Sequence, residues 1–281
     1  MTSRTTASGR QVFIKWRKAL NERDWLAADS CLAPDASYNQ EDRSGLREEM
    51  MMALDAVPDL QSEVDTLVVD REDQAVAARI IHRGIVTKSI HGIKVTGEAV
   101  EWPEHIMAWL SKDSDKISRI ETLIDTQNQA ATSLPRTPAD LTQRPPPEGF
   151  SLDATYRSYM SALNGSQLRL DMPKYFHPQI IHTAKEWAIG DLIAFLETSP
   201  TLFDGLRLSV ADLLVDTEGH QVAARIKFEG VPVKPFFGLG PPKERKKICF
   251  FEHAFYKLDG DKFKFIWAML DIVSFKKQVE S

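Results

Sequence analysis

Cysteine is almost absent from this sequence, which has two such residues in 281, Cys31 and Cys249. Two thiols so far apart match neither the cysteine framework of small disulfide-rich domains nor the paired spacing of a zinc site. Long apolar runs are also missing, because no stretch approaches the roughly 18 residues of a membrane span, and the polar start Met1–Gly9 has no apolar signal core. We therefore expect a cytoplasmic protein with no membrane partner and no bound metal.

Positive charge is not in excess either. The sequence has 35 Lys and Arg against 40 Asp and Glu, a formal net charge of -5, so it lacks the basic surface that binds phosphate backbones. Hydrophobic residues make up 43% of the chain and include 14 Phe and 6 Trp, which is enough to build packed cores and to exclude disorder. We expect no nucleic-acid partner, and the length suits two ordinary domains.

A sequence repeat divides the chain into two copies. Residues 67–80 (LVVDREDQAVAARI) recur as residues 213–226 (LLVDTEGHQVAARI), with nine of fourteen positions identical. Each copy is too long for a solenoid repeat of roughly 20–50 residues, so we expect two domains with a core each. Three further pairs of segments keep the register: Ala19-Leu20-Asn21 with Ala162-Leu163-Asn164, Glu104-His105 with Glu252-His253, and Asp125 with Asp271.

A proline-rich segment separates the copies. Residues 128–150 contain five prolines, a density that favours an extended, semi-rigid spacer over helix or strand. We therefore predict a first domain over residues 10–127, a linker over residues 128–150 and a second domain over residues 151–278.

Each copy begins with helical patterns and continues with strand patterns. Phe13, Trp16 and Leu20 keep helical spacing, Asp24 is placed to cap a second helix, and a third is expected over residues 45–54. This order predicts the α+β class: two tandem cone-shaped α+β barrel domains, each a bent antiparallel sheet with about three helices on its concave face. The expected strands are residues 60–70, 76–87, 95–110 and 117–127 in the first copy and 206–216, 222–231, 247–258 and 263–275 in the second.

Three segments of the second copy carry a resemblance to a known family. They are Val222-Ala-Ala-Arg225-Ile226, the strand with Glu252-His253, and Phe265-Ile-Trp267-Ala-Met-Leu-Asp271 after an Asp-Gly turn. With these segments the sequence resembles the SnoaL-like polyketide cyclase family of the nuclear-transport-factor-2-like cone superfamily. The first copy departs from the pattern, because Glu121 stands where the second copy has Trp267.

The resemblance implies a pocket without metal or organic cofactor, in which the aspartate of the last strand moves a proton on a polyketide- or terpenoid-like substrate. Asp271 and Asp125 hold that position. Alternation along the strand puts Asp271 on the face of Phe265 and Trp267, and apolar surroundings raise the pKa of a carboxyl toward the range useful in acid/base catalysis. We predict both aspartates as catalytic, with a structural strand-end carboxylate as the alternative, and favour the second copy as the active one.

The recurring Glu-His pair offers further candidates. Adjacent strand residues face opposite ways, so either Glu252 with Tyr256 or His253 with Phe255 enters the pocket, and we retain Glu252 and His253 as alternative catalytic residues. His182 is a candidate partner of Asp271, because neutral imidazole is a natural proton shuttle.

Substrate contacts are predicted from the remaining shared positions. Arg79 and Arg225 occupy the same place in the two copies, and a guanidinium on the pocket face would hold the aspartate ionised or bind a substrate oxyanion. The alternative is an exterior arginine bridging to another strand. The predicted substrate-binding residues are Trp267, Tyr256, Arg225, Arg79, Tyr38 and Glu121.

The function expected from this pattern is a cofactor-independent cyclase or isomerase that acts on a small molecule of natural-product biosynthesis by proton transfer. The alternative is a noncatalytic small-molecule-binding or protein-interaction scaffold with degenerate pockets. Single-domain relatives commonly pair sheet to sheet, so we expect the two copies to form an internal pseudo-dimer that is monomeric in solution.

Overall fold

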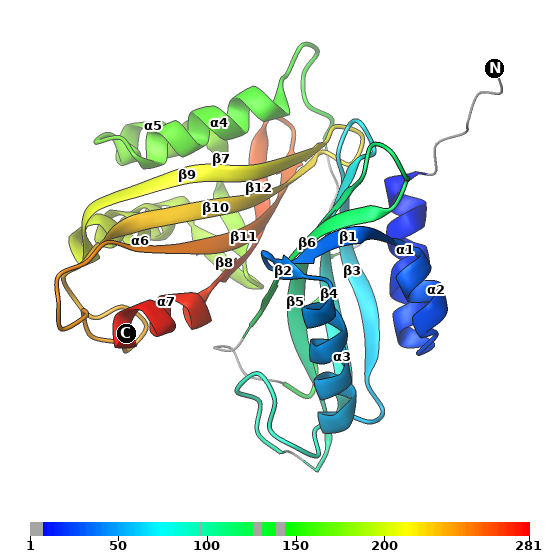
Figure 1. Ribbon diagram of the computed structural model, residues 1–281. Helices are drawn as coiled ribbons and strands as arrows, with labels where there is room; N and C mark the ends of the chain where they lie inside the picture. The colour runs from blue at the N-terminus through cyan, green and yellow to red at the C-terminus, as the bar shows by residue number, and fades with distance from the viewer. Residues whose placement is uncertain (1–7, 96, 126–130, 139–143) are drawn as a thin grey trace. The chain divides into compact units, whose positions relative to one another are not determined.

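The computed structural model describes residues 8–95, 97–125, 131–138 and 144–281 (Figure 1). It divides into two compact units, residues 1–137 and 138–281. The ends of the predicted fourth strand (residues 126 and 127) and parts of the predicted linker (residues 128–130 and 139–143) lie outside the described residues.

The first unit places three helices before and between the strands of one mixed sheet, as far as the structure describes it. Its strand order is β2-β1-β6-β5-β4-β3. The elements are α1 (Gly9–Asn21), α2 (Trp25–Ser30), β1 (Leu32–Tyr38), β2 (Glu41–Asp42), α3 (Ser44–Ala56), β3 (Gln61–Val69), β4 (Ala75–Ile85), β5 (Ala99–Leu110) and β6 (Ile117–Ile124).

The second unit repeats this order and adds a helix at its end. Its strand order, β8-β7-β12-β11-β10-β9, is that of the first unit element by element. The elements are α4 (Leu152–Leu163), α5 (Leu168–Tyr175), β7 (Phe176–His182), β8 (Lys185–Ala188), α6 (Ile189–Leu202), β9 (Phe203–Asp216), β10 (Gln221–Pro232), β11 (Ile248–Asp259), β12 (Lys262–Leu270) and α7 (Ile272–Glu280).

The α+β class and the tandem architecture predicted from the sequence are confirmed. The sheets differ from the prediction in two respects. They are mixed rather than antiparallel, because β1 pairs parallel to β6 and β7 parallel to β12. Among the described residues, each sheet is an open series of strands with two edges, so neither closes into a barrel.

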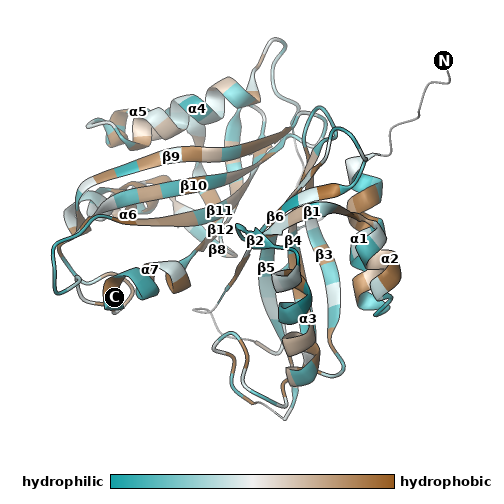
Figure 2. Ribbon diagram, viewed as in Figure 1, coloured by the Kyte–Doolittle hydropathy of each residue, from teal (hydrophilic) through white to brown (hydrophobic). Residues whose placement is uncertain are grey.

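The helices form as the spacing predicts because each has an apolar side to bury. Phe13 and Trp16 of α1 are buried in one cluster with Val76, Ala78 and Ile80 of β4, while apolar and polar residues alternate along the long strands (Figure 2). This cluster defines the helix-covered face of the sheet. The odd-numbered neighbours on β4, including Arg79, lie on the opposite face.

Local capping sets the starts of two helices. The Asp24 carboxylate accepts a hydrogen bond of 3.0 Å from the backbone N–H of Ala27, as predicted for the start of α2. The Asp271 carboxylate likewise accepts a 2.9 Å hydrogen bond from the N–H of Ser274. The strand predicted over residues 263–275 therefore ends at Leu270, and α7 follows it.

The start of the proline-rich segment packs on the first unit. Ala131 exchanges two backbone hydrogen bonds with Glu101, and the Arg136 guanidinium pairs with the Glu101 carboxylate at 2.9 and 3.0 Å. In the described part of the chain, no helix is both long and apolar enough to cross a membrane.

We expect Asp271→Ala to destabilise the second unit by about 1 kcal/mol, which lowers the melting midpoint by roughly 2–4 °C, because the substitution removes the cap of α7. Asp271→Asn retains an oxygen that caps nearly as well, so its midpoint should stay close to wild type. Thermal unfolding of both variants checks this. Equal loss in both would show that the negative charge, not the cap, matters.

Candidate active site

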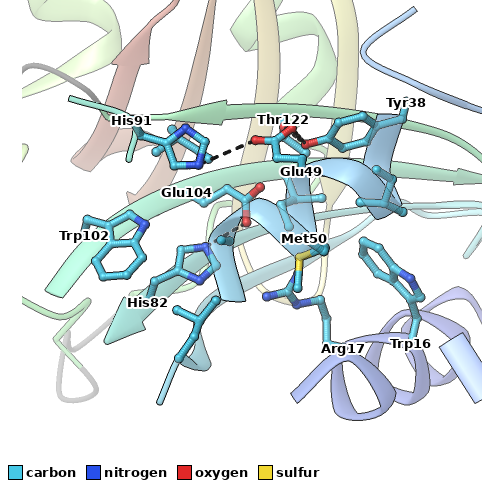
Figure 3. Close-up of a pocket in the computed structure, with 15 residues that line it drawn as sticks. Trp16, Arg17, Tyr38, Glu49, Met50, His82, His91, Trp102, Glu104 and Thr122 are labelled. Atoms are coloured by element: carbon cyan, nitrogen blue, oxygen red, sulfur yellow. Dashed lines mark hydrogen bonds and ion pairs between the residues drawn. The ribbon is translucent and has the colours of Figure 1, made fainter. Parts of the chain in front are cut away.

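A cavity in the first unit is lined by α1, α3 and the helix-covered face of β4, β5 and β6 (Figure 3). Its free volume is about 30 Å³, more than the roughly 10–15 Å³ that a cavity needs to hold one water molecule. Apolar side chains make up much of its wall, including Trp16, Met50, Trp102 and Ile106. Titratable groups project into the same space: Arg17, Tyr38, Glu49, His82, His91 and Glu104.

Three hydrogen-bonded polar side chains, Ser62, His82 and Glu104, form a chain whose last two members line the cavity. His82 Nε2 lies 2.9 Å from Glu104 Oε2, and His82 Nδ1 lies 2.8 Å from Ser62 Oγ. The imidazole also stacks on the Trp102 ring, with 5.4 Å between ring centroids. Because both ring nitrogens have partners and one ring face is covered, the imidazole is held in a fixed orientation against Glu104.

The surroundings of Glu104 favour its ionised form. Burial by itself raises the pKa of this carboxyl, but the hydrogen bond to His82 and the charges of His82 and Arg17 outweigh burial. The pKa of Glu104 therefore lies below its ordinary value. The ionised form, which a general base requires, is therefore favoured.

A second carboxyl in the cavity has the opposite tendency. The Tyr38 hydroxyl lies 2.5 Å from Glu49 Oε2 and 3.2 Å from Thr122 Oγ1. Burial raises the pKa of Glu49, and the negative charge of Glu104 adds to the rise although the Tyr38 hydrogen bond opposes it. One cavity therefore holds two carboxyls whose pKa values are displaced in opposite directions, which is the arrangement expected of an acid and a base.

His91 lies on the Glu49 side of the cavity. Its Nε2 is 3.8 Å from Glu49 Oε1, and burial lowers the pKa of this imidazole. Neutral imidazole is therefore the favoured form near pH 7.

The second unit has the same glutamate in different surroundings. Glu252 occupies the position of Glu104 in the repeat, but Phe228 stands where the first copy has His82. The side chain lies near a packed group of tyrosines, Tyr156, Tyr159 and Tyr256. Burial raises the pKa of Glu252 to about 7.

The opposite face of each sheet holds most of the residues that the sequence predicted for the pocket. In the second unit, Trp267 pairs with Phe255, and Arg225 pairs with His253. Their neighbours along the strands, Ala224, Ala254 and Ile266, point to the other face and belong to the core between helices and sheet. Trp267, Arg225 and His253 therefore lie on the face opposite the helices, and the structure does not bring them to the space between helices and sheet where the sequence predicted a pocket.

The same correction applies to the first unit. Glu121 pairs with Met107 on the opposite face, whereas its neighbour Thr122 lines the cavity. Arg79 forms a buried ion pair with Asp65, with Nη1 and Oδ2 2.7 Å apart, and its Nη2 donates to the Pro135 carbonyl. The alternative interpretation of Arg79, a bridge to another strand, is the one that this geometry supports.

The two predicted catalytic aspartates follow the last long strand of their copies, and Asp125 is not among the residues that line the cavity of the first unit. Asp271 caps α7. The charge of Asp125 acts on Arg79, on the face opposite the helices. In the part of the chain that the structure describes, Asp271 makes no hydrogen bond or ion pair with His182, whose ring instead lies 5.6 Å from that of Trp187.

Four predicted residues do lie on the helix-covered side. Tyr38 lines the cavity of the first unit, and His182 holds the matching position beside β12 of the second. Glu252 and Tyr256 share their face with Ala254, a residue of the core between helices and sheet. The structure thus places Glu252 with Tyr256 on one side of β11, and His253 with Phe255 on the other.

Sequence reasoning missed most of the cavity. Arg17, Glu49 and Trp102 carried no recurring pattern, and Glu104 entered only as the counterpart of Glu252. His82 had a usable signal, because it follows Val76, Ala78 and Ile80 at period two on the face that contacts the helices.

A family model described as SnoaL-like polyketide cyclase matches residues 10–131 and 154–279. Comparison with solved structures finds a SnoaL-like polyketide cyclase from Agrobacterium tumefaciens, 23% identical, over 47% of this chain and 99% of that one, with a TM-score of 0.42. TsrD from Streptomyces laurentii is 22% identical over 45% of this chain and 92% of its own, with a TM-score of 0.40. IdmH, a putative polyketide cyclase from Streptomyces antibioticus, is 21% identical over 42% of this chain and 93% of its own, with a TM-score of 0.37. No curated protein matches the sequence.

We expect Glu252→Gln to stabilise the protein increasingly as pH rises from about 4.5 to 7. In the folded state Glu252 stays protonated up to its pKa of about 7, whereas in the unfolded chain the same carboxyl ionises near its ordinary pKa. The wild-type protein therefore becomes less stable as pH rises across this window. The gain for the variant above pH 7 has an upper limit of about 3 kcal/mol.

Urea unfolding at pH 5 and pH 8 measures this difference. Glu186→Gln removes an exposed carboxylate from β8 of the same unit and serves as the matched control. If both variants shift stability equally at the two pH values, the burial of Glu252 has no energetic consequence.

Proposed function

Because the chain belongs to the SnoaL-like polyketide cyclase family, we propose that it catalyses a cofactor-independent cyclisation or isomerisation of a small molecule by proton transfer. The family supports a cyclase- or isomerase-type function for the chain. We assign the chemistry to the first unit, in place of the second unit favoured by the sequence. The observation that carries this assignment is the Glu104–His82 pair in a cavity that also contains Glu49.

Glu104 is the proposed general base. Its Oε2 is occupied by His82, while Oε1 has no hydrogen-bond partner among the described residues and is available to a substrate C–H. Removal of a proton from the carbon beside a carbonyl transfers that proton to Glu104 and leaves an enolate. His82 positions the carboxylate and keeps its pKa low.

Glu49 and Tyr38 are the proposed general acid. Burial raises the pKa of Glu49 and so favours the protonated form that an acid needs, and the Tyr38 hydroxyl lies beside it, 2.5 Å from Oε2. Delivery of that proton to a second atom of the enolate completes an isomerisation. In a cyclisation, the same proton goes to the oxygen of the carbonyl that the enolate carbon attacks.

The cavity wall supports a polyketide- or terpenoid-like substrate. Two tryptophans, Trp16 and Trp102, offer flat apolar surfaces on either side of the carboxyls (Figure 3). A ring system exceeds the free volume of about 30 Å³, so its entry requires lining side chains to move. Met50 suits this, because an unbranched thioether adapts its shape at low cost.

A second function, noncatalytic binding or scaffolding, is favoured for the second unit. Phe228 removes the imidazole that would hold the glutamate ionised. Tyr156, Tyr256 and Phe263 pack ring against ring in its interior. We assign no proton transfer to this unit, and the internal pseudo-dimer of the two copies stays a prediction.

We expect Glu104→Gln to reduce activity by a factor of about 10²–10⁴, the usual contribution of a general base. The assay is NMR detection of α-hydrogen exchange with D₂O, catalysed by the full chain, in a panel of small cyclic ketones and β-dicarbonyl compounds that includes 2-tetralone. Glu252→Gln is the matched variant in the other copy and should exchange at the wild-type rate.

The panel also separates the two proposals. No catalysed exchange by wild type with any compound would favour binding over catalysis. Loss of exchange in Glu252→Gln but not in Glu104→Gln would move the active site to the second unit.

A further prediction concerns the positioning role of His82. Its hydrogen bond and charge lower the pKa of Glu104, so His82→Gln should move the acidic limb of the kcat/KM profile to higher pH. Activity on the alkaline plateau should fall much less than in Glu104→Gln. A profile whose acidic limb stays in place would show that His82 does not control the ionisation of Glu104.

A further inference from the structure

Arg17 is a buried charge without a polar partner. Only 6% of the surface of Arg17 is exposed, although arginine is rarely buried unless it is paired with an opposite charge. The guanidinium lies 5.5 Å from the centre of the Trp16 ring, and among the described residues it forms no hydrogen bond or ion pair. Burying an unpaired charge costs several kcal/mol, so the side chain is retained against a substantial penalty.

The fold itself does not require this arginine. The repeat matches Ala19-Leu20-Asn21 with Ala162-Leu163-Asn164, which places Met160 of α4 at the position of Arg17. Met160 is buried in the core between helices and sheet. The same place on the same helix therefore accepts a neutral side chain where no catalytic pair is present.

Arg17 lies in the wall of the cavity that contains Glu104 (Figure 3). The negative charge of Glu104 raises the pKa of the Arg17 guanidinium, although burial lowers it by more. The charged atoms of the two side chains are farther apart than the 4.0 Å that defines an ion pair. Two opposite charges thus share one small cavity without meeting. Both charges border the space that a bound substrate would enter.

We propose that Arg17 binds the carbonyl oxygen of the substrate and stabilises the oxyanion that forms as Glu104 removes the adjacent proton. This inference rests on the proposed function. The electrons of the broken C–H bond form the C=C bond of the enolate, the carbonyl π electrons move to oxygen, and the proton goes to Glu104. The guanidinium offers up to five N–H donors to that oxygen.

Charge balance limits the substrate class. With a neutral ketone or ester bound, the positive charge of Arg17 faces the negative charge of Glu104, and His82 adds positive charge when it is protonated. After proton transfer the negative charge has moved from Glu104 to the substrate oxygen, and Arg17 still compensates it. A carboxylate at the same place would add a further anion beside Glu104 and Glu49 in a buried site, which is unfavourable. The reacting end of the substrate is therefore a neutral carbonyl with an acidic α carbon.

The first experiment uses Arg17→Met, which copies the residue of the second unit, and Arg17→Lys, which keeps the charge. The rate at which Arg17→Met exchanges the α hydrogens of 2-tetralone should be about 10²–10³-fold lower than the wild-type rate, as when one oxyanion donor is removed. This loss should persist on the alkaline plateau. Arg17→Lys should recover part of it. If raising the pH restores Arg17→Met to the wild-type rate, Arg17 acts only on the ionisation of Glu104 and the inference is overturned.

The second experiment measures binding and does not require turnover. The probe is 2-naphthol, whose ionised form resembles the enolate of 2-tetralone in shape and charge. The wild-type chain should bind the naphtholate, with Arg17→Met at least tenfold weaker and Glu104→Gln not weaker. Absence of binding by wild type, or equal binding by Arg17→Met, overturns the inference.

The two proposals fail in different ways. If Glu104→Gln abolishes exchange while Arg17→Met exchanges at the wild-type rate, the proposed function stands and the role of Arg17 falls. If Glu104→Gln retains exchange, the proposed function falls, and naphtholate binding then decides whether Arg17 is an anion site.

Discussion

A carboxyl buried between helices and sheet must be compensated, and this requirement shapes both halves of the protein. In the first unit, compensation comes from the His82 hydrogen bond and from the charges of His82 and Arg17, so that Glu104 stays ionised. In the second unit these partners are missing, and the pKa of Glu252 rises to about 7. Burying this side chain then costs less free energy in its neutral form than in its ionised form.

The two copies show how duplication separates architecture from chemistry. Their sheets share strand order and register, including the parallel pairing that brings Tyr38 and His182 to matching places. The differences include side chains that project between helices and sheet, such as His82 against Phe228 and Arg17 against Met160. These exchanges convert a polar cavity into a packed aromatic interior without altering the backbone plan.

The fold was largely predictable because its signals are local and repeated. Helical spacing in α1, the Asp24 cap and the alternating strands each follow from neighbouring residues. The end of β12 was not predictable from the sequence. Phe265, Trp267 and Met269 lie at every second position, and Asp271 and Val273 continue that spacing, so the strand pattern does not stop at Leu270. Only the hydrogen bond from Ser274 to the Asp271 carboxylate distinguishes a helix start from one more strand residue.

The site was less predictable because alternation tells which residues share a face but not which face the helices cover. On β4 both faces are buried, with Val76, Ala78 and Ile80 on one and Ala77, Arg79 and Ile81 on the other. Hydropathy therefore does not decide between them. Arg79 drew attention because it recurs at Arg225, whereas Arg17 recurs nowhere. In this duplicated chain, recurrence marks what both copies share, including the glutamate itself, whereas the side chains that set its ionisation are found where the copies differ.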